Sequence, residues 1–243
     1  MDTVLTGVYA FAKSTSSRTK RCFGAAGRRA AAAIRWTIWQ TRTALCTRWN
    51  RCARTCGKTR KRRMIRLNGK KIENIKVRPE RTDDHGAVYD LVRAAFATAE
   101  HADGNEQDLV AALRKSDAFV PQLSLVAEVD GALAGYILFT KALVGQREVL
   151  ALAPLAVLPA YQRKGVGKAL VQAGHSRAKA LGFTHSLVLG SETYYPQFGY
   201  VPAQTLGVQV PPGMPPETFM ALRLQNDAPA LCGAVTYAPE FGM

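Results

Sequence analysis

Several features are missing from this 243-residue sequence, and each absence excludes a class of protein. No apolar run reaches the roughly 18 residues that a membrane-spanning helix needs, so no transmembrane segment is expected. Five cysteines, four of them crowded near the start, do not suit an even-numbered disulfide framework. No basic leader precedes an apolar core at the N-terminus, which argues against a secretory signal and favours a cytoplasmic location.

Acidic residues are almost absent from the first 71 positions, where Asp2 stands against 19 lysines and arginines. The remainder carries a formal charge of −3, so the overall +15 belongs to a basic arm attached to a mildly acidic domain. All three tryptophans and four cysteines also fall in the arm. This break predicts a disordered or partly helical arm over 1–71, a folded domain over 72–226, and a tail over 227–243 that packs on the domain.

The arm has several interpretations. Apolar residues between Ile34 and Cys52 recur at roughly helical spacing, which is typical of a basic amphipathic helix on an anionic membrane or nucleic acid. The run from Lys58 to Arg63 predicts weak, salt-sensitive binding to polyanions. An arginine-rich, acid-poor leader is also typical of a transit peptide. Alternatively the arm has no function, and residues before Met64 are a non-native extension.

Metal and P-loop sites are not expected in the arm. Cys46, Cys52 and Cys56 are spaced by six and four residues with no histidine nearby, which does not fit structural zinc. Gly57-Lys58-Thr59 resembles the end of a P-loop, but Cys52 stands where the first glycine belongs.

From residue 72 onward, strand and helix patterns alternate. An Asp130-Gly131 dipeptide predicts a hairpin, Asp83 and Asp84 are expected to cap a helix, and Pro154 within an apolar strand predicts an edge, a bulge or a splay. The order of elements predicts an α/β fold with a mixed sheet and helices on its faces. Strands are expected over 75–78, 123–129, 132–139, 149–158, 186–189 and 218–224, and helices over 88–96, 106–115 and 166–181.

A glycine-bearing segment, Gln162-Arg163-Lys164-Gly165-Val166-Gly167, lies between an apolar strand and the start of the best-defined helix. Glycines let the backbone approach a phosphate closely, and a helix N-terminus adds unpaired N–H groups with a partial positive charge. Arg163, Lys164 and Lys168 add full charges nearby. From the residues alone, the segment is either a phosphate site or a tight turn.

Two motifs in the same order resemble those of the GNAT N-acetyltransferases. The segment from Leu155 to Leu170 is similar to the family's acetyl-CoA motif, Gln/Arg-x-x-Gly-x-Gly/Ala, and Tyr194-Tyr195-Pro196-Gln197-Phe198-Gly199-Tyr200 resembles its aromatic motif. The tail Tyr237-Ala238-Pro239-x-Phe241 resembles one bacterial branch. The resemblance covers about 75–224 and leaves the arm outside. It implies a central mixed, largely antiparallel sheet of six to seven strands, splayed at the fourth and flanked by about four helices.

The resemblance also implies a mechanism, in which an amine attacks acetyl-CoA directly in a ternary complex, without a metal. The backbone of Leu155, Ala156 and Val157 would pair with the pantetheine arm, and the Val157 N–H would polarise the thioester carbonyl. Tyr195 aligns with the family's acid, which protonates the leaving thiolate, and Tyr194 is its rival. The pyrophosphate would be held by Gln162, Arg163, Lys164, Gly165, Val166, Gly167 and Lys168.

The general base is not evident. Many relatives carry a glutamate on the fourth strand, but residues 150–158 contain no carboxylate. Glu192, near Tyr195, is the candidate, and a water-mediated base is the alternative. His175 and His185 titrate in a useful range but are more often structural. Cys232 is expected to be a small buried residue.

Three functions are therefore open. The first is transfer of an acetyl group from acetyl-CoA to a primary amine of an unidentified small molecule or protein. The second is a catalytically silent acyl-CoA-binding module or sensor. The third is an acetyltransferase recruited to nucleic acid or ribosomes by its basic arm. Segments 99–121 and 210–216 are expected to flank the acceptor groove, and the sequence fits either a monomer or a homodimer.

Overall fold

The computed structural model describes residues 74–97 and 104–242, so the predictions for the basic arm and for its boundary near residue 72 lie outside the described residues. The helices are α1 (His85–Phe96), α2 (Glu106–Leu113) and α3 (Val166–Ala180), where about four were expected. The strands are β1 (Ile75–Pro79), β2 (Phe119–Val129), β3 (Ala132–Val144), β4 (Arg147–Val157), β5 (His185–Leu189), β6 (Val201–Pro202), β7 (Val208–Gln209), β8 (Phe219–Arg223) and β9 (Gly233–Thr236). Short 3-10 turns are η1 (Thr82–Asp84), η2 (Pro159–Tyr161), η3 (Tyr195–Phe198), η4 (Ala203–Leu206) and η5 (Pro239–Phe241).

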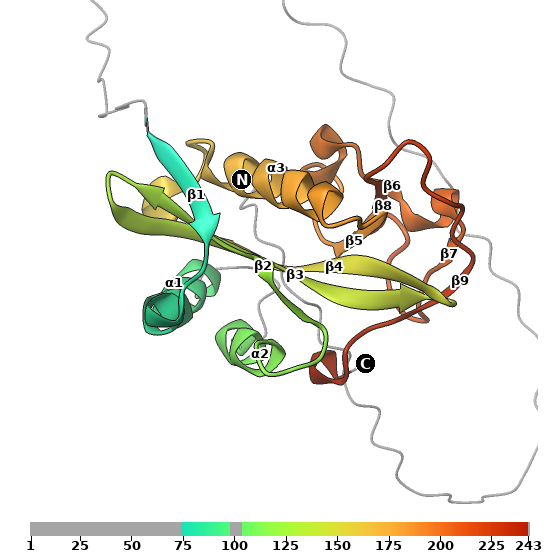
Figure 1. Cartoon of the computed structure of the whole chain (residues 1–243), viewed down its shortest axis with the longest axis horizontal. Helices are drawn as coiled ribbons and strands as arrows, with labels where there is room; N and C mark the ends of the chain where they lie inside the picture. The colour runs from blue at the N-terminus through green and yellow to red at the C-terminus, as the bar shows by residue number, and fades with distance from the viewer. Residues whose placement is uncertain (1–73, 98–103, 243) are drawn as a thin grey trace, which may run out of the picture. The chain divides into compact units, whose positions relative to one another are not determined.

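The strands form one mixed sheet in the order β1-β2-β3-β4-β5-β8-β6, and β9 pairs with both β3 and β7 (Figure 1). Among the described strands, the β4–β5 and β7–β9 pairs are parallel and the others are antiparallel. The predicted mixed, largely antiparallel sheet is confirmed. It also includes β6, β7 and β9, which are too short to produce a recognisable alternation in the sequence.

The Asp130-Gly131 hairpin is confirmed. β2 and β3 pair antiparallel up to Val129 and Ala132, directly on either side of the dipeptide. Both turn residues have left-handed backbone angles, with φ of 51° at Asp130 and 83° at Gly131. Two successive positive φ values give a type I′ turn, whose twist matches that of the paired strands.

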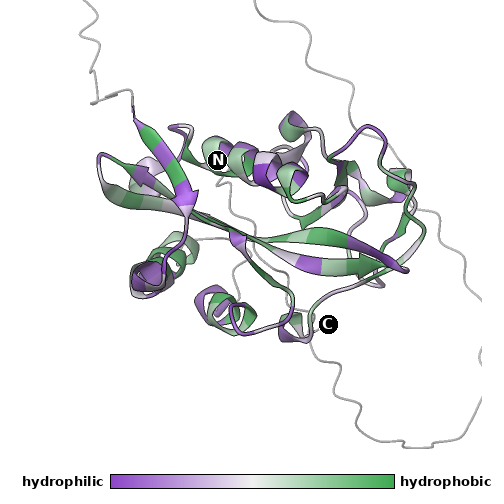
Figure 2. Cartoon of the chain, in the orientation of Figure 1, coloured by the Kyte–Doolittle hydropathy of each residue, from purple (hydrophilic) through white to green (hydrophobic). Residues whose placement is uncertain are grey.

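Helices cover both faces of the sheet: α1 and α2 lie on one face and α3 on the other (Figure 1). Val88 of α1 shares a buried cluster with Leu138 of β3, whereas Leu170 of α3 shares another with Phe139 of β3. Successive residues of β3 therefore point to opposite faces, and both faces are buried. The central strands are accordingly apolar, as Figure 2 shows. No helix in the described ranges is long and apolar enough to cross a membrane.

α3 approaches the sheet closely at two glycines. A Cβ at Gly135 of β3 would lie 2.9 Å from Val166 Cγ1, and a Cβ at Gly174 of α3 would overlap the ring of Phe139. Close-packed interiors leave no room for such additions. These two residues therefore set the distance between α3 and the strands beneath it.

The helix expected over 88–96 begins earlier, at His85. Asp84 occupies the predicted cap position, but its carboxylate does not cap α1. It accepts hydrogen bonds from the Arg81 backbone N–H at 2.7 Å and from Arg78 Nη1 and Nη2 at 2.6 and 3.0 Å. The bonds from Arg78 lower the pKa of Asp84 to about 2. Asp84 thus joins η1 to β1.

β4 separates from β5 partway along its length. The two strands pair only at Leu150–Leu152, whereas β4 stays paired with β3 as far as Val157. The register shifts here, because Ala153 and Pro154 of β4 both lie opposite Leu138 of β3, and the Ala153-Pro154 peptide bond is cis. The predicted splay of the fourth strand is confirmed. Pro154 lies at the bulge, where its missing N–H removes no ladder bond.

The last described segment pairs with the sheet through β9. Thr236 lies opposite Leu143, and Val235 lies opposite Val144, near the turn between β3 and β4. β9 also pairs with β7. The segment after β8 is thereby joined to β3, at a point beyond the last residue of β3 that pairs with β2.

Candidate active site

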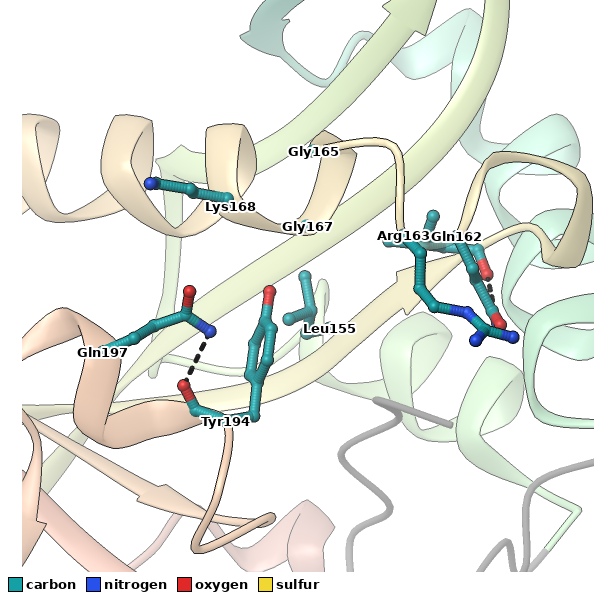
Figure 3. A pocket seen from close by; sticks show the side chains of 9 residues that line it. Leu155, Gln162, Arg163, Gly165, Gly167, Lys168, Tyr194 and Gln197 are labelled. Atoms are coloured by element: carbon teal, nitrogen blue, oxygen red, sulfur yellow. Dashed lines mark hydrogen bonds between the residues drawn. The ribbon is translucent and has the colours of Figure 1, made fainter. Parts of the chain in front are cut away.

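A cavity of about 240 Å³ opens where β4 has separated from β5, beside the N-terminal end of α3 (Figure 3). We call it the splay cavity. Seven of the ten residues predicted to bind the cofactor line it, together with two residues of the aromatic motif. The lining residues are Leu155, Val157, Gln162, Arg163, Gly165, Gly167, Lys168, Tyr194 and Gln197.

The end of β4 presents backbone groups to this cavity. The Leu158 N–H donates to the Ala134 carbonyl at 3.0 Å, so Leu158 occupies a hydrogen-bonded position opposite β3. Because bonding directions alternate in an antiparallel pair, the N–H and C=O of Val157 and Leu155 point away from β3. β5 does not pair with β4 beyond Leu152, so these groups face the opening.

The loop from β4 to α3 is fixed by a side chain and by two left-handed residues. Gln162 Nε2 donates to the Val157 carbonyl at 3.1 Å and so holds the loop against the end of the strand. Arg163 and Gly165 have φ of 58° and 94°. A Cβ at Gly165 would meet only Ile75 Cδ1, at 3.7 Å, so the backbone angle rather than space favours glycine there.

The N-terminus of α3 is open to an anion. Its first intrahelical bond runs from the Ala169 N–H to the Gly165 carbonyl at 2.9 Å, which leaves the N–H groups of Val166, Gly167 and Lys168 without intrahelical acceptors. No acidic residue occupies the first turn, and no side chain of the described residues caps it. The partial positive charge of the helix end is therefore unopposed, with Lys168 and Arg163 beside it.

Tyr194 enters the splay cavity from the side of η3. Figure 3 shows its hydroxyl directed at Gly167, with Leu155 and Gln197 beside the ring. A Cβ at Gly167 would lie 2.7 Å from Tyr194 Oη. Gln197 Nε2 donates to the Tyr194 carbonyl at 2.9 Å. Burial raises the pKa of Tyr194 to about 12, so the phenol keeps its proton at neutral pH.

Tyr195 lies in the core instead. Its side chain is completely buried, and its ring meets those of Tyr194 and Tyr200 at centroid distances of 5.2 and 5.5 Å. It belongs to the cluster between α3 and the sheet. Both tyrosines were candidates for the acid in the sequence. Tyr194 lines the splay cavity, whereas Tyr195 packs against Tyr194 in the core.

Three residues predicted to bind the cofactor do not line the cavity. Ala156 belongs to the cluster beneath α1, and its backbone faces β3. Val166 is buried against Gly135. Lys164 is exposed, with Nζ 5.9 Å from the centroid of the Tyr161 ring.

The predicted base does not line the cavity either. Glu192 is exposed in the turn before Tyr194. Gln197, which was not predicted as a site residue, does line it. The sequence could have indicated Gln197 as a site residue. It comes three residues after Tyr194, and residues i and i+3 fall on the same side of a 3-10 turn.

Both histidines named as alternatives have structural contacts. His175 Nε2 lies 3.1 Å from Tyr200 Oη, which is also 2.8 Å from Ser186 Oγ. Burial lowers the pKa of His175 to about 4. His185 Nδ1 lies 3.0 Å from Thr184 Oγ1, and burial lowers the pKa of His185 as well.

Cys232 does not line the splay cavity. Cys232 is exposed, contrary to the prediction that it is buried. No group of three or more histidine, cysteine, aspartate or glutamate side chains within residues 74–97 and 104–242 could hold a metal ion.

Known proteins are similar to this chain in sequence. A model of the Acetyltransferase (GNAT) family matches residues 86–200. The uncharacterized N-acetyltransferase YjhQ of Escherichia coli (strain K12) is 41% identical over 126 residues, which are 50% of this chain and 70% of YjhQ.

Two solved structures are also similar. A GNAT family acetyltransferase from Brucella melitensis, in complex with acetyl-CoA, is 30% identical with a TM-score of 0.58, covering 69% of this chain and 98% of that one. YhbS from Escherichia coli, in complex with CoA, is 28% identical with a TM-score of 0.62, covering 70% and 92%. The family match extends from α1 through the aromatic motif and so includes every residue that lines the splay cavity. With 41% identity to YjhQ across 70% of its length, the chain belongs to the GNAT family of N-acetyltransferases.

Proposed function

We propose that this protein transfers the acetyl group of acetyl-CoA to a primary amine by direct attack within a ternary complex. One observation carries the proposal: the end of β4, which no longer pairs with β5, and the N-terminus of α3 meet at the splay cavity. The first can pair with an amide-bearing arm and the second can bind a diphosphate, and acetyl-CoA contains both groups. The domain that carries this activity is proposed to extend over 72–226, with the tail over 227–243 packed on it.

Two sets of groups bind the donor in this proposal. The backbone groups of Leu155 and the C=O of Val157, which face away from β3, pair with the pantetheine amides as an added strand would. The N–H groups from Arg163 to Lys168 surround the pyrophosphate, and the side chains of Arg163 and Lys168 add charge. The acetyl-CoA and CoA carried by the two solved relatives support this assignment.

The proposed transfer step forms an amide bond and releases the CoA thiol. A neutral amine, having lost a proton to water, attacks the thioester carbonyl, so that a C–N bond forms. The nitrogen, now positively charged, gives a second proton to water, and the C–S bond breaks. The Val157 N–H stabilises the negative charge on the carbonyl oxygen. The leaving sulfur takes a proton, and Tyr194 rather than Tyr195 is proposed as its donor because only the Tyr194 hydroxyl lies in the splay cavity. Solvent then restores the proton to the phenol.

A second candidate is a catalytically silent module that holds acyl-CoA. It is favoured by the lack of any carboxylate in residues 150–158 and by the position of Glu192 outside the splay cavity. A bound water would have to serve as the base if the protein is catalytic. Both candidates need the same donor site, so binding of acetyl-CoA does not separate them.

Release of the CoA thiol distinguishes the acetyltransferase from the silent module. Acetyl-CoA and a panel of primary amines would be incubated with the full chain, and liberated thiol followed with a colorimetric disulfide reagent. The proposal predicts thiol release that needs both the amine and the protein, with a matching amount of N-acetylated product. Stoichiometric binding of acetyl-CoA, without product from any amine, would establish the silent module instead.

A further inference from the structure

A second cavity, of about 390 Å³, lies at the edge of β3, between the start of β2 and the end of β9. It shares no lining residue with the splay cavity. Its volume falls within the range of about 300–1,000 Å³ that is usual for small-molecule sites. We call it the β3-edge cavity.

The charges around the β3-edge cavity are mainly negative. Asp117, Glu148 and Glu240 line it, and Lys141 is the one cation among the described residues that line it. Lys141 Nζ lies 3.1 Å from a Glu148 carboxylate oxygen. Within the described ranges neither Asp117 nor Glu240 forms an ion pair. The formal balance is therefore −2, and the Lys141–Glu148 pair shows that an ammonium fits against this wall.

A polar group without a partner adds a second, independent indication. Tyr237 lines the cavity, its ring packs on Phe241 at a centroid distance of 5.4 Å, and burial raises the pKa of its phenol. Its hydroxyl makes no hydrogen bond within residues 74–97 and 104–242. The side chain is partly buried, so this hydroxyl is still open to water or to a ligand. Tyr237 therefore offers a hydrogen bond to whatever occupies the cavity.

Apolar surface completes the lining. Leu143 is 43% exposed, one of few large apolar side chains this exposed in the described chain, and it lines the same cavity. Small ligand sites commonly combine an apolar wall with a few polar groups that fix orientation. A hydrated inorganic ion would not use this surface, whereas a short hydrocarbon chain would.

We propose that the β3-edge cavity binds a small organic cation, namely a primary ammonium on a short apolar chain. The ammonium meets the carboxylates, the chain lies on Leu143, and the Tyr237 hydroxyl bonds to the ligand or to its water. The inference does not rest on the proposed acetyl transfer, because the residues of the two cavities are different.

Amide chemical shifts of the full-length protein test this directly. Pentylamine would be titrated at pH 7 without acetyl-CoA, with 1-pentanol and hexanoate as neutral and anionic controls of similar length. Saturable shifts are expected at Ala118, Ala142 and Thr236, but not at Gly165 or Gly167. Shifts that never saturate, or equal affinity for pentanol, would overturn the proposal.

Two variants with opposite expected effects sharpen the test. Glu148→Gln removes an attractive charge and should weaken pentylamine binding about two- to fivefold. Lys141→Met removes the internal competitor for Glu148 and should strengthen binding by a similar factor. Both side chains are about half exposed, so both variants should fold. Changes in the same direction in both variants would contradict the site.

A third variant tests the hydroxyl of Tyr237, and a last experiment tests whether the bound amine reacts with acetyl-CoA. Tyr237→Phe keeps the ring but removes the hydroxyl, and should weaken binding without altering the shifts of the splay cavity. Acetyl-CoA is then added to the pentylamine complex. Formation of N-acetylpentylamine identifies the ligand class as the acceptor, whereas unreacted amine identifies a non-reacting effector, and both results support a cation site.

Discussion

The hydroxyl of Tyr194 lies directly against Gly167 in the first turn of α3, at a position where a Cβ on residue 167 would be only 2.7 Å away. The two residues belong to the two separate motifs that resemble the GNAT family, and the fold brings them together across the splay cavity. Gly167 thus serves two purposes: its N–H is available to an anion, and its missing side chain leaves room for the phenol.

Gly167→Ala should weaken acetyl-CoA binding without lowering the stability of α3. Alanine is a better helix former than glycine by roughly 0.5–1 kcal/mol, so the helix itself tolerates the change. The added methyl group would displace Tyr194 and narrow the splay cavity. We expect acetyl-CoA affinity to fall about tenfold or more, measured by calorimetry, because forcing a carbon into packed space typically costs about 1–3 kcal/mol.

Two other helical glycines provide matched controls. A Cβ at Gly86 in α1 meets nothing within 4 Å, so Gly86→Ala should leave binding unchanged and stability equal or slightly higher. Gly174→Ala should lower the melting temperature, because its Cβ would overlap the fully buried ring of Phe139. If Gly86→Ala weakened acetyl-CoA binding as much as Gly167→Ala does, the contact with Tyr194 would not be the cause.

Tyr194→Phe should lower turnover while leaving the fold intact. Proton donation of this kind is worth roughly 10²–10⁴-fold, so we expect kcat to fall by about 10² or more with little change in acetyl-CoA affinity. Tyr195→Phe keeps a ring packed against Tyr200 and should act mainly on stability. Steady-state kinetics of both variants would distinguish these roles. Loss of turnover in Tyr195→Phe alone would assign the acid to the buried tyrosine.

His175 should make the stability of the domain depend on pH. Burial lowers its folded-state pKa to about 4, whereas an unfolded histidine has a pKa of about 6.5. Between these values the unfolded chain binds more protons, so the free energy of unfolding should fall as the pH falls from 6.5 to 4. The full effect is up to about 3 kcal/mol for a shift of this size. Urea denaturation at several pH values measures it.

His175→Gln offers the control for that titration. Glutamine can still reach Tyr200 with a polar group but does not titrate in this range. The difference in unfolding free energy between the two proteins should therefore shrink toward acid pH. If the difference stayed constant from pH 7 to pH 4, the pKa of His175 would not differ between the folded and unfolded states as described.

The basic arm should account for any binding to polyanions. Residues 1–71 carry 19 lysines and arginines against one acid, whereas the remainder is slightly acidic. Removal of residues 1–63 should abolish binding to single-stranded nucleic acid or heparin. Full-length binding should weaken steeply with salt, because neutralising phosphates releases counterions. Fluorescence anisotropy at several salt concentrations would measure both effects, and binding that survives the deletion would exclude the arm as its source.

Local patterns were sufficient to predict most of the fold. Asp130-Gly131 predicted the hairpin because two positive φ values are needed there, and Pro154 predicted the disturbance in β4 because it has no N–H for the ladder. β6, β7 and β9 were not predicted, since each is held by its neighbours rather than by an alternation of its own. Asp84 was misjudged because its partner, Arg78, is a residue of the preceding strand.

Less of the candidate site than of the fold could be predicted from the sequence. The motif around Gly165 indicated which loop could meet a phosphate, but not that Lys164 turns outward or that Ala156 faces the other side of the sheet. Adjacent tyrosines at 194 and 195 look equivalent in a sequence. They differ in the structure because successive residues at the start of a 3-10 turn point in different directions, one into the cavity and one into the core.

Calorimetric titration of acetyl-CoA would show whether the splay cavity is a donor site. The titration would use the full chain and, beside it, residues 64–243. We expect saturable binding of one acetyl-CoA per chain, with equal affinity in both proteins, because the lining residues all lie between Leu155 and Gln197. Absence of binding to either protein, with both shown to be folded, would contradict the donor site and the transferase activity proposed from it.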